Sequence, residues 1–196
     1  MEENLNPIAN ENKRNKKNKI FTGITVALII VMLFFVVINV FIYVNVEVDG
    51  LSMYPTLSHQ DVVKANKHAK VHHGDIVVIK KTDGTGSYNI VKRVIAMEGD
   101  HIEIKDDKVY LNGEILVEEY IKDDPATEFV DESKTWGTED MIVPEGKFFY
   151  LGDNRYNSID SREDGLGSLD DVIGVVDNWT IATRGIRNFF FDLFYR

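Results

Sequence analysis

An uncharged stretch of 27 residues, from position 20 to position 46, constrains this chain more than any other feature of its sequence. It is rich in Ile, Val and Phe, and only a few small or polar residues interrupt it: Thr22, Gly23, Thr25, Asn39 and Asn45. About 20 apolar residues in a helix cross the hydrocarbon core of a bilayer, so the stretch is long enough to span one. A soluble helix this apolar on every side needs a very large core, and a cleaved leader has an apolar run of only about 7–15 residues. We therefore predict a membrane-spanning helix over residues 20–46.

Positive charges gather immediately before this stretch, with five Lys or Arg among residues 13–19. Lys and Arg beside a membrane helix stay on the cytoplasmic side, which places the N-terminus inside the cell. We therefore predict a disordered, basic cytoplasmic tail over residues 1–19, the membrane helix, and an extracytoplasmic domain over residues 47–196. A nucleic-acid patch is the alternative interpretation of the basic cluster, but the cluster is short and adjoins the membrane.

The charge and the cysteine count exclude several classes of function. The chain carries a formal net charge of −10, and the tail up to residue 19 is positive, so the outer domain is more acidic still. Such a domain repels phosphate backbones, which argues against a nucleic-acid partner. The absence of cysteine excludes disulfides, thiol chemistry and thiolate metal sites. The outer domain must therefore be held together by packing alone, for which about 150 residues suffice.

After residue 47 the pattern changes to short β-type runs separated by Gly, Asp and Asn. We predict strands over residues 61–65, 75–80, 88–97, 101–105, 108–111, 147–151 and 172–178. Asp83-Gly84 and Asn112-Gly113 have the composition of tight hairpin turns. Residues 121–138 are polar and aperiodic, which predicts a loop. The Phe-rich residues 187–196 are expected to pack on the domain rather than to rest at the membrane interface. The outer domain is thus predicted to be mainly β.

A serine lies between a glycine and a proline soon after the membrane helix. In the segment 48–57, VDGLSMYPTL, Gly50 permits close approach of the backbone and Pro55 fixes a turn. Ser52 is therefore expected on a constrained, exposed bend. A serine in such a turn is more often a structural residue than a nucleophile, so this segment alone does not predict catalysis.

A lysine occurs within an apolar run in the segment 89–100, NIVKRVIAMEGD. In a strand, Lys92 shares a face with Ile90, Val94 and Ala96. Burial of a lysine lowers its pKa from about 10.4, so that a neutral amine can take a proton from a serine hydroxyl. The alternative is an edge-strand lysine whose stem packs while its amine reaches water. The run by itself favours this alternative.

A third segment, 152–162 with the sequence GDNRYNSIDSR, has Asp, Asn, Arg or Ser at eight of eleven positions. These side chains bond readily to backbone and to each other. A solvated surface loop is one interpretation. The segment directly follows an apolar strand, however, and its paired Asp and Arg favour an ordered polar network.

These segments occur in the order S-M-x-P-T, then K-R-V followed by G-D, then G-D-N-R-x-N-S-x-D-S-R, with a weaker G-D-I-V at 74–77. In this order, behind a single anchor, they resemble bacterial type I signal peptidases of the Gram-positive form. The resemblance implies a largely antiparallel β domain related to the self-cleaving SOS repressors. It also implies a serine endopeptidase of the bacterial cell membrane that removes signal peptides from secreted preproteins. Such enzymes cut after small residues at A-x-A-like sites.

The resemblance also implies roles for individual residues. Ser52 matches the nucleophile and Lys92 the general base, with the Ser52 N–H as an oxyanion donor. Ser158 matches the residue that orients the lysine amine. The supporting polar residues would be Asp160, Arg162, Asp153 and Arg93, and shallow apolar substrate pockets would be lined by Met53, Ile90 and Val91. Some members have a serine hydroxyl two residues before the nucleophile as a second oxyanion donor. This chain has Gly50 there, so another group must act instead.

Three other interpretations remain open. His68, His72 and His73 raise the possibility of a zinc hydrolase, although no H-E-x-x-H pattern is present. His101 or His59 could serve as the base instead of a lysine. The chain could also be an inactive anchored domain that binds leaders or envelope partners. We predict no metal or other cofactor, and as partners secretory preproteins, the lipid bilayer and the secretion translocon.

Overall fold

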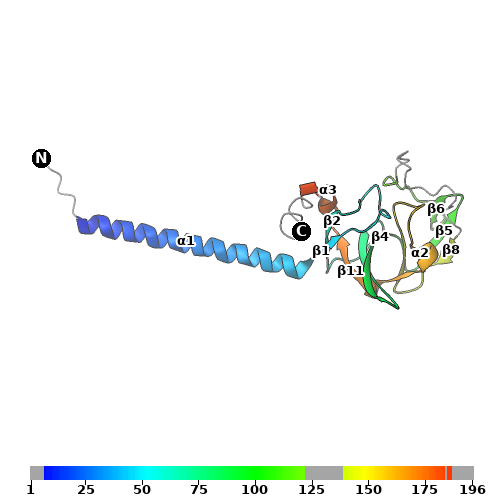
Figure 1. The fold of residues 1–196 in the computed structure, drawn as a ribbon, viewed down its shortest axis with the longest axis horizontal. Helices are drawn as coiled ribbons and strands as arrows, with labels where there is room; N and C mark the ends of the chain where they lie inside the picture. The colour runs from blue at the N-terminus through cyan, green and yellow to red at the C-terminus, as the bar shows by residue number, and fades with distance from the viewer. Residues whose placement is uncertain (1–6, 122–138, 184, 187–196) are drawn as a thin grey trace. The chain divides into compact units, whose positions relative to one another are not determined.

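The computed structural model describes residues 7–121, 139–183 and 185–186, in two units that meet between Ile42 and Tyr43. The first unit is the long helix α1, Pro7–Ile42 (Figure 1). Its part Arg14–Ile42 contains an 18-residue stretch with a mean hydropathy of 3.0 and is long and apolar enough to cross a membrane. Thr22, Thr25 and Asn39 each donate a side-chain hydrogen bond to the carbonyl four residues earlier, so the helix satisfies their polar groups internally.

The helix differs from its predicted bounds at both ends. Residues 7–19, predicted to be disordered, are helical. At the other end the helix stops at Ile42 instead of residue 46, because Tyr43–Glu47 forms strand β1. Val44-Asn-Val-Glu alternates apolar and polar side chains, and β1 pairs along its whole length with β2, Val62–Asn66. The predicted disorder of residues 1–6 lies outside the described residues.

The second unit contains two antiparallel sheets. The seven-stranded sheet has the order β1-β2-β11-β3-β4-β9-β10. Its further members are β3 (Ile76–Asp83), β4 (Gly86–Met97), β9 (Lys147–Leu151), β10 (Gly167–Ser168) and β11 (Val172–Val176). The four-stranded sheet has the order β7-β6-β5-β8, and in Figure 1 β5, β6 and β8 form a separate group. Its members are β5 (His101–Lys105), β6 (Lys108–Leu111), β7 (Glu114–Ile115) and β8 (Glu139–Ile142).

The mainly antiparallel β class is confirmed, and each of the seven predicted strands is present, three with the predicted bounds and four with ends shifted by one to three residues. The Asp83 carboxylate accepts hydrogen bonds from the backbone N–H groups of Thr85 and Gly86 and so closes the β3–β4 hairpin. Asn112 and Gly113 turn the chain between β6 and β7 with positive φ angles. Short helices follow β9, β10 and β11: these are, in order, α2 (Ser161–Asp164), the 3-10 helix η1 (Leu169–Asp171) and α3 (Asn178–Ala182). The predicted loop falls almost wholly outside the described residues, as does the Phe-rich tail.

Strand β4 is central to the second unit and contributes side chains to all of its three apolar clusters. It runs between β3 and β9, and its second half is buried. Its side chains reach three apolar clusters: Val91 belongs to the first, Ile95 and Ala96 to the second, and Val94 to the third. Any polar side chain in this half of β4 must therefore find its partners inside the protein.

Candidate active site

The loop between β1 and β2 carries Ser52. Hydrogen bonds between the two ends of this loop and buried apolar side chains within it fix the position of the serine. The Val48 N–H donates to the Asp61 carbonyl at 2.8 Å, and the Gln60 N–H donates to the Val48 carbonyl at 2.8 Å. Met53 and Leu57 are fully buried in the first apolar cluster. Because the residue after Ser52 is anchored in the core, the serine has little freedom to move. Gly50 adopts a φ of +89°, which disfavours residues with a side chain.

Lys92 lies in β4 opposite Val77 of β3, and only 4% of it is exposed. Its Nζ donates a hydrogen bond to Ser52 Oγ at 2.6 Å. The structure thus brings together the two residues for which nucleophile and base roles are predicted, across 40 positions of sequence. The expected common face is seen for Ile90 and Val94, which pack in the third cluster. Ala96 departs from it, because the β4–β9 register shifts between Val94 and Ala96.

Burial lowers the pKa of Lys92 to about 8, since the apolar surroundings disfavour its charged form. The charges of Asp160, Asp153 and Asp164 oppose this shift, and that of Arg162 adds to it. A lysine with this pKa is neutral in about a tenth of molecules at pH 7. The hydrogen bond to Ser52 therefore joins a hydroxyl to an amine that can accept its proton.

Arg93, the next residue in β4, makes a two-point ion pair with Asp153. Its Nε and one terminal nitrogen donate to the Asp153 carboxylate at 2.8 and 2.7 Å, and its other terminal nitrogen donates to the Gly74 carbonyl at 2.8 Å. Two parallel hydrogen bonds of this kind fix the orientation of the Arg93 guanidinium plane relative to the Asp153 carboxylate plane. It ties the strand that carries Lys92 to the first turn of the segment 152–162, and to the G-D-I-V segment noted in the sequence.

A second pair orders the other end of that segment. Asp160 is fully buried and accepts from Arg162 Nε at 2.7 Å and from the Gly152 N–H at 3.0 Å. It also caps the short helix α2. The Asn154 N–H donates to the Ser52 carbonyl at 3.0 Å. The segment 152–162 is therefore an ordered loop that contacts the backbone of the serine directly. We call it the polar loop.

Close packing at Gly152 leaves no room for a side chain. A β-carbon there would lie 2.5 Å from the Ser52 carbonyl oxygen and 2.6 Å from Ser158 Cβ, and would also clash with Ser158 Oγ. Ser158 is buried, and in the part of the chain that the structure describes its Oγ has no hydrogen-bond partner. The bond between Ser158 and Lys92 that the resemblance implies is thus not formed here, and the hydrogen bond of the Lys92 amine goes to Ser52.

Replacing Gly152 with alanine is expected to lower the free energy of unfolding by about 1–3 kcal/mol, because the new methyl group must displace backbone atoms. Chemical denaturation of the full chain in detergent micelles measures this loss. Gly84→Ala is the matched control, since a β-carbon at Gly84 meets nothing within 4 Å. Equal stability of the two variants would contradict the packing described here.

The three predicted substrate contacts differ in their exposure. Met53 is 1% exposed and belongs to the core, and Val91 is also buried. Ile90 is partly exposed and packs against the third cluster. Contact with a substrate stays a prediction for all three, and Ile90 offers the most accessible surface.

The histidines raised as alternatives occupy several separate places. His59 Nδ1 accepts from the Gly50 N–H at 3.2 Å, His73 bonds to Asp100 at 2.5 Å, and His101 bonds to Asp140 at 2.7 Å. Among the residues that the structure describes, no three His, Asp or Glu side chains gather as metal ligands would.

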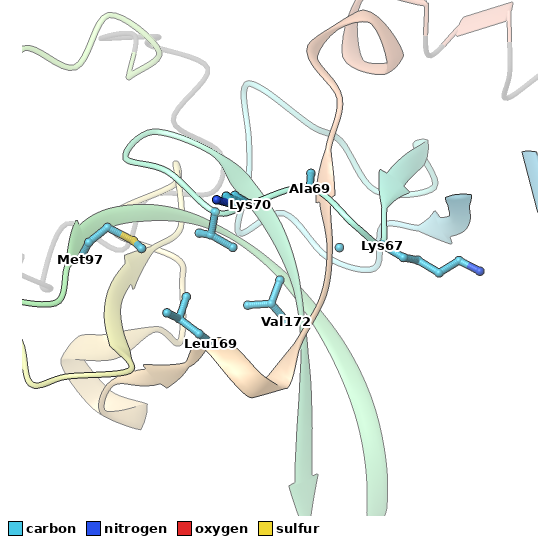
Figure 2. Close-up of a pocket in the computed structure, with 8 residues that line it drawn as sticks. Lys67, Ala69, Lys70, Met97, Leu169 and Val172 are labelled. Atoms are coloured by element: carbon cyan, nitrogen blue, oxygen red, sulfur yellow. The ribbon is translucent and has the colours of Figure 1, made fainter. Parts of the chain in front are cut away.

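A pocket of about 370 Å³ lies elsewhere on the domain, and none of the predicted site residues lines it. It is lined by Lys67, Ala69, Lys70, Val71, Met97, Leu169, Val172 and Gly174. Figure 2 shows the amine of Lys67 pointing away from the apolar side chains of Leu169 and Val172. The lining of the pocket is mixed, with two lysines among apolar side chains.

Sequence reasoning missed three residues of the polar network: Asn154, Arg155 and Glu118. Asn154 acts through its backbone N–H, and the residue type does not predict which carbonyl a backbone N–H will bind. Arg155 belongs to the polar segment 152–162, but its residue type does not indicate its partner. Its carboxylate partner Glu118 lies 37 positions earlier, and no local pattern pairs the two residues.

A serine hydroxyl bonded to a buried lysine amine is the arrangement used by the Ser–Lys variants of the serine proteases. Residues 21–180 match the family model described as "Signal peptidase, peptidase S26", and the chain belongs to this family. It is 37% identical over 169 residues to signal peptidase I U of Bacillus subtilis strain 168, covering 81% of this chain and 87% of the relative. It is also 37% identical over 165 residues to signal peptidase I of Bacillus licheniformis, covering 82% of this chain and 87% of that relative. A solved signal peptidase I from Enterococcus faecalis V583 is 31% identical, with a TM-score of 0.45, and the match covers 56% of this chain and 98% of that one.

Proposed function

We propose that this chain is a membrane-anchored serine endopeptidase that removes signal peptides from secreted preproteins, with Ser52 as the nucleophile and Lys92 as the general base. The observation that carries the proposal is the 2.6 Å contact between Lys92 Nζ and Ser52 Oγ, made by a lysine that is 4% exposed. Family membership supplies the substrate class, since the relatives named above are signal peptidases.

The chemistry follows from this contact. Neutral Lys92 takes the Ser52 proton as Oγ attacks the scissile carbonyl, and it then gives that proton to the leaving amine. The resulting acyl-enzyme is an ester on Ser52. Lys92 next takes a proton from a water molecule that attacks this ester, and Ser52 leaves with its hydroxyl restored. The network of Arg93, Asp153 and Asp160 keeps the side chains of Ser52 and Lys92 within hydrogen-bonding distance of each other.

The Ser52 N–H is the proposed first donor to the oxyanion. Gly50 provides no hydroxyl, and its own N–H already donates to His59 Nδ1. The second donor must therefore come from another group, and a backbone N–H or a water molecule fits the requirement.

We also propose that α1 anchors the enzyme, with its basic end in the cytoplasm and the β unit outside. Ser52 lies ten positions beyond Ile42, where α1 ends. An extended chain of that length spans at most about 35 Å, which keeps the serine near the surface where a leader emerges from the membrane. Lipid and the secretion translocon are the partners that this placement implies.

The proposal is tested with the full chain in detergent micelles and a preprotein that carries an A-x-A site. Cleavage directly after the second small residue is the expected result, whereas binding of the leader without cleavage would favour an inactive binding domain. A second preprotein with both small residues changed to leucine controls for unspecific proteolysis. Cleavage of both preproteins at the same rate would contradict the proposed specificity.

The rate of cleavage should rise with pH, because only the neutral form of Lys92 can act as base. With a pKa of about 8, the neutral fraction, and with it kcat/KM, falls about 50-fold between pH 8 and pH 6. Initial rates measured across this range test the expectation, with circular dichroism at each pH as a control for folding. A rate that stays flat down to pH 5 would rule out a lysine base.

A further inference from the structure

Residues 116–121 follow β7 and form a short irregular segment that we call the strap. It ends in a turn in which the Ile121 N–H donates to the Glu118 carbonyl at 3.0 Å. Its side chains alternate: Leu116, Glu118 and Tyr120 are partly buried, whereas Val117 and Glu119 are exposed. The Leu116 N–H donates to the Val109 carbonyl at 2.9 Å, which fixes the start of the strap to β6. The strap therefore presents a carboxylate and a phenol to the protein and keeps its other face in solvent.

The carboxylate of Glu118 pairs with Arg155 of the polar loop. Both terminal nitrogens of Arg155 donate to it, one of them at 3.0 Å, and the two side chains are only 1% and 9% exposed. The Tyr120 hydroxyl donates to the same carboxylate at 2.6 Å. Burial, together with the charge of Glu118, raises the pKa of Tyr120, so the phenol keeps its proton and remains a donor. Arg155 and Tyr120 thus both donate hydrogen bonds to the Glu118 carboxylate and fix its position.

The ring of Tyr120 reaches the other arginine of the network. The guanidinium carbon of Arg93 lies 3.8 Å from the centre of this ring, a close cation–π contact. Arg93 follows Lys92 in β4 and pairs with Asp153. The strap therefore touches one arginine beside the proposed base and one within the polar loop.

The contact with Arg155 leads to the backbone of Ser52 in a few steps. Arg155 Nε donates to the Gly152 carbonyl at 3.1 Å, and Arg162 donates to the Arg155 carbonyl at 2.8 Å, so Arg155 is built into the polar loop. The adjoining Asn154 N–H holds the Ser52 carbonyl. A shift of Arg155 would thus move the backbone on which Ser52 rests.

We infer that Glu118 and Tyr120 are positioning residues, which hold the polar loop and β4 so that Ser52 and Lys92 meet in reactive geometry. The inference rests on the proposed function. A purely structural ion pair would explain the burial of Glu118 and Arg155. However, buried pairs add little net stability compared with apolar residues, whereas they fix orientation well. The joint contact of the strap with Arg155 in the polar loop and with Arg93, which follows Lys92 in β4, favours the positioning role.

The test uses the full chain in micelles and measures kcat, KM and the pH profile for cleavage of the A-x-A preprotein. Glu118→Gln keeps the shape of the side chain but removes the charge that faces Arg155. Tyr120→Phe keeps the ring over Arg93 and removes only the hydroxyl. Glu119→Gln makes the same chemical change as the first variant at the exposed neighbour, so it is the matched control.

Glu118→Gln is expected to lower kcat about 10- to 100-fold while KM changes less than about twofold, because misplacement of reacting groups acts on the chemical step. The acidic limb of the pH profile should move up by roughly half a unit, since a loosened loop admits water around Lys92 and weakens the desolvation that lowers its pKa. Tyr120→Phe should also lower kcat and raise the acidic limb, but less than Glu118→Gln does. Glu119→Gln should match the wild type in both.

A merely structural role would reduce the amount of folded enzyme, which scales the rate equally at every pH and leaves the limb in place. A folded Glu118→Gln with the wild-type kcat, or with an unmoved limb, therefore overturns the inference. If Glu118→Gln does not fold, an unchanged profile in Tyr120→Phe overturns it instead. Wild type that cleaves nothing overturns the proposed function, whereas active wild type with unaffected variants overturns the positioning role alone.

Discussion

Replacing Ser52 with alanine is expected to lower the rate of signal-peptide cleavage by about 10⁴-fold or more, the loss seen when a serine protease loses its nucleophile. The reason is direct: no other hydroxyl bonds to Lys92 in the described part of the chain, so no second group can form the acyl-enzyme. The measurement is cleavage of the A-x-A preprotein at pH 8 under single-turnover conditions, which isolates the chemical step from product release.

Folding must be shown to survive the change. Ser52 lies in a loop whose anchors, Met53 and Leu57, are untouched by the substitution, so circular dichroism and the denaturation midpoint should stay close to wild type. Ser58→Ala, in the same loop, is the matched control and should retain full activity. Ser52→Ala that cleaves at a rate comparable to Ser58→Ala would show that Ser52 is not the nucleophile, and attention would pass to another hydroxyl.

The sequence predicted the fold class because alternation and turn residues are local signals. His101–Lys105 and Lys147–Leu151 have the predicted bounds, and the turn at Asn112 was read from its composition alone. Strand β1 was missed because its residues continue the uncharged run of the helix, and only pairing with β2 makes them a strand. Strands β7 and β10 are two residues long, which is too short to produce any periodicity.

The candidate site was predictable to a different extent for each residue. Burial of Lys92 follows from the apolar side chains on either side of it in β4, but its partner lies 40 positions away and was named only through the family resemblance. Close packing at Gly152 depends on how the polar loop folds back on Ser52, which no local pattern encodes. The strap contacts of Glu118 and Tyr120 are long-range in the same sense, and they required the structure.

Lys92→Met is expected to make the protein more stable at neutral pH while it abolishes cleavage. The folded protein holds Lys92 with a pKa of about 8, against 10.5 for the unperturbed side chain. Below pH 8 the lysine is charged in both states, so the folded state bears the full cost of a buried charge, about 3 kcal/mol. Loss of the bond to Ser52 offsets about 1 kcal/mol. The net gain at pH 7 is therefore about 2 kcal/mol.

The gain in stability could come from removal of the buried charge or from better packing by methionine. The pH dependence of the free energy of unfolding distinguishes these two causes. Between pH 8 and pH 10.5 the unfolded wild type binds a proton that the folded protein does not, so wild-type stability rises with pH in this window. The advantage of Lys92→Met must then shrink towards pH 10.5, whereas a packing gain would persist. Denaturation in micelles at pH 7 and pH 10 measures the difference between variant and wild type.

Lys80→Met, at an exposed position of β3, is the control and should change stability by no more than about 0.5 kcal/mol at either pH. Lys92→Met that is no more stable than wild type at pH 7 would mean that the lysine is not desolvated in the folded state, which removes the physical basis for a neutral amine base. A gain in stability together with lost cleavage would instead show that the depressed pKa is maintained at a cost to the fold, because the proton transfer from Ser52 requires it.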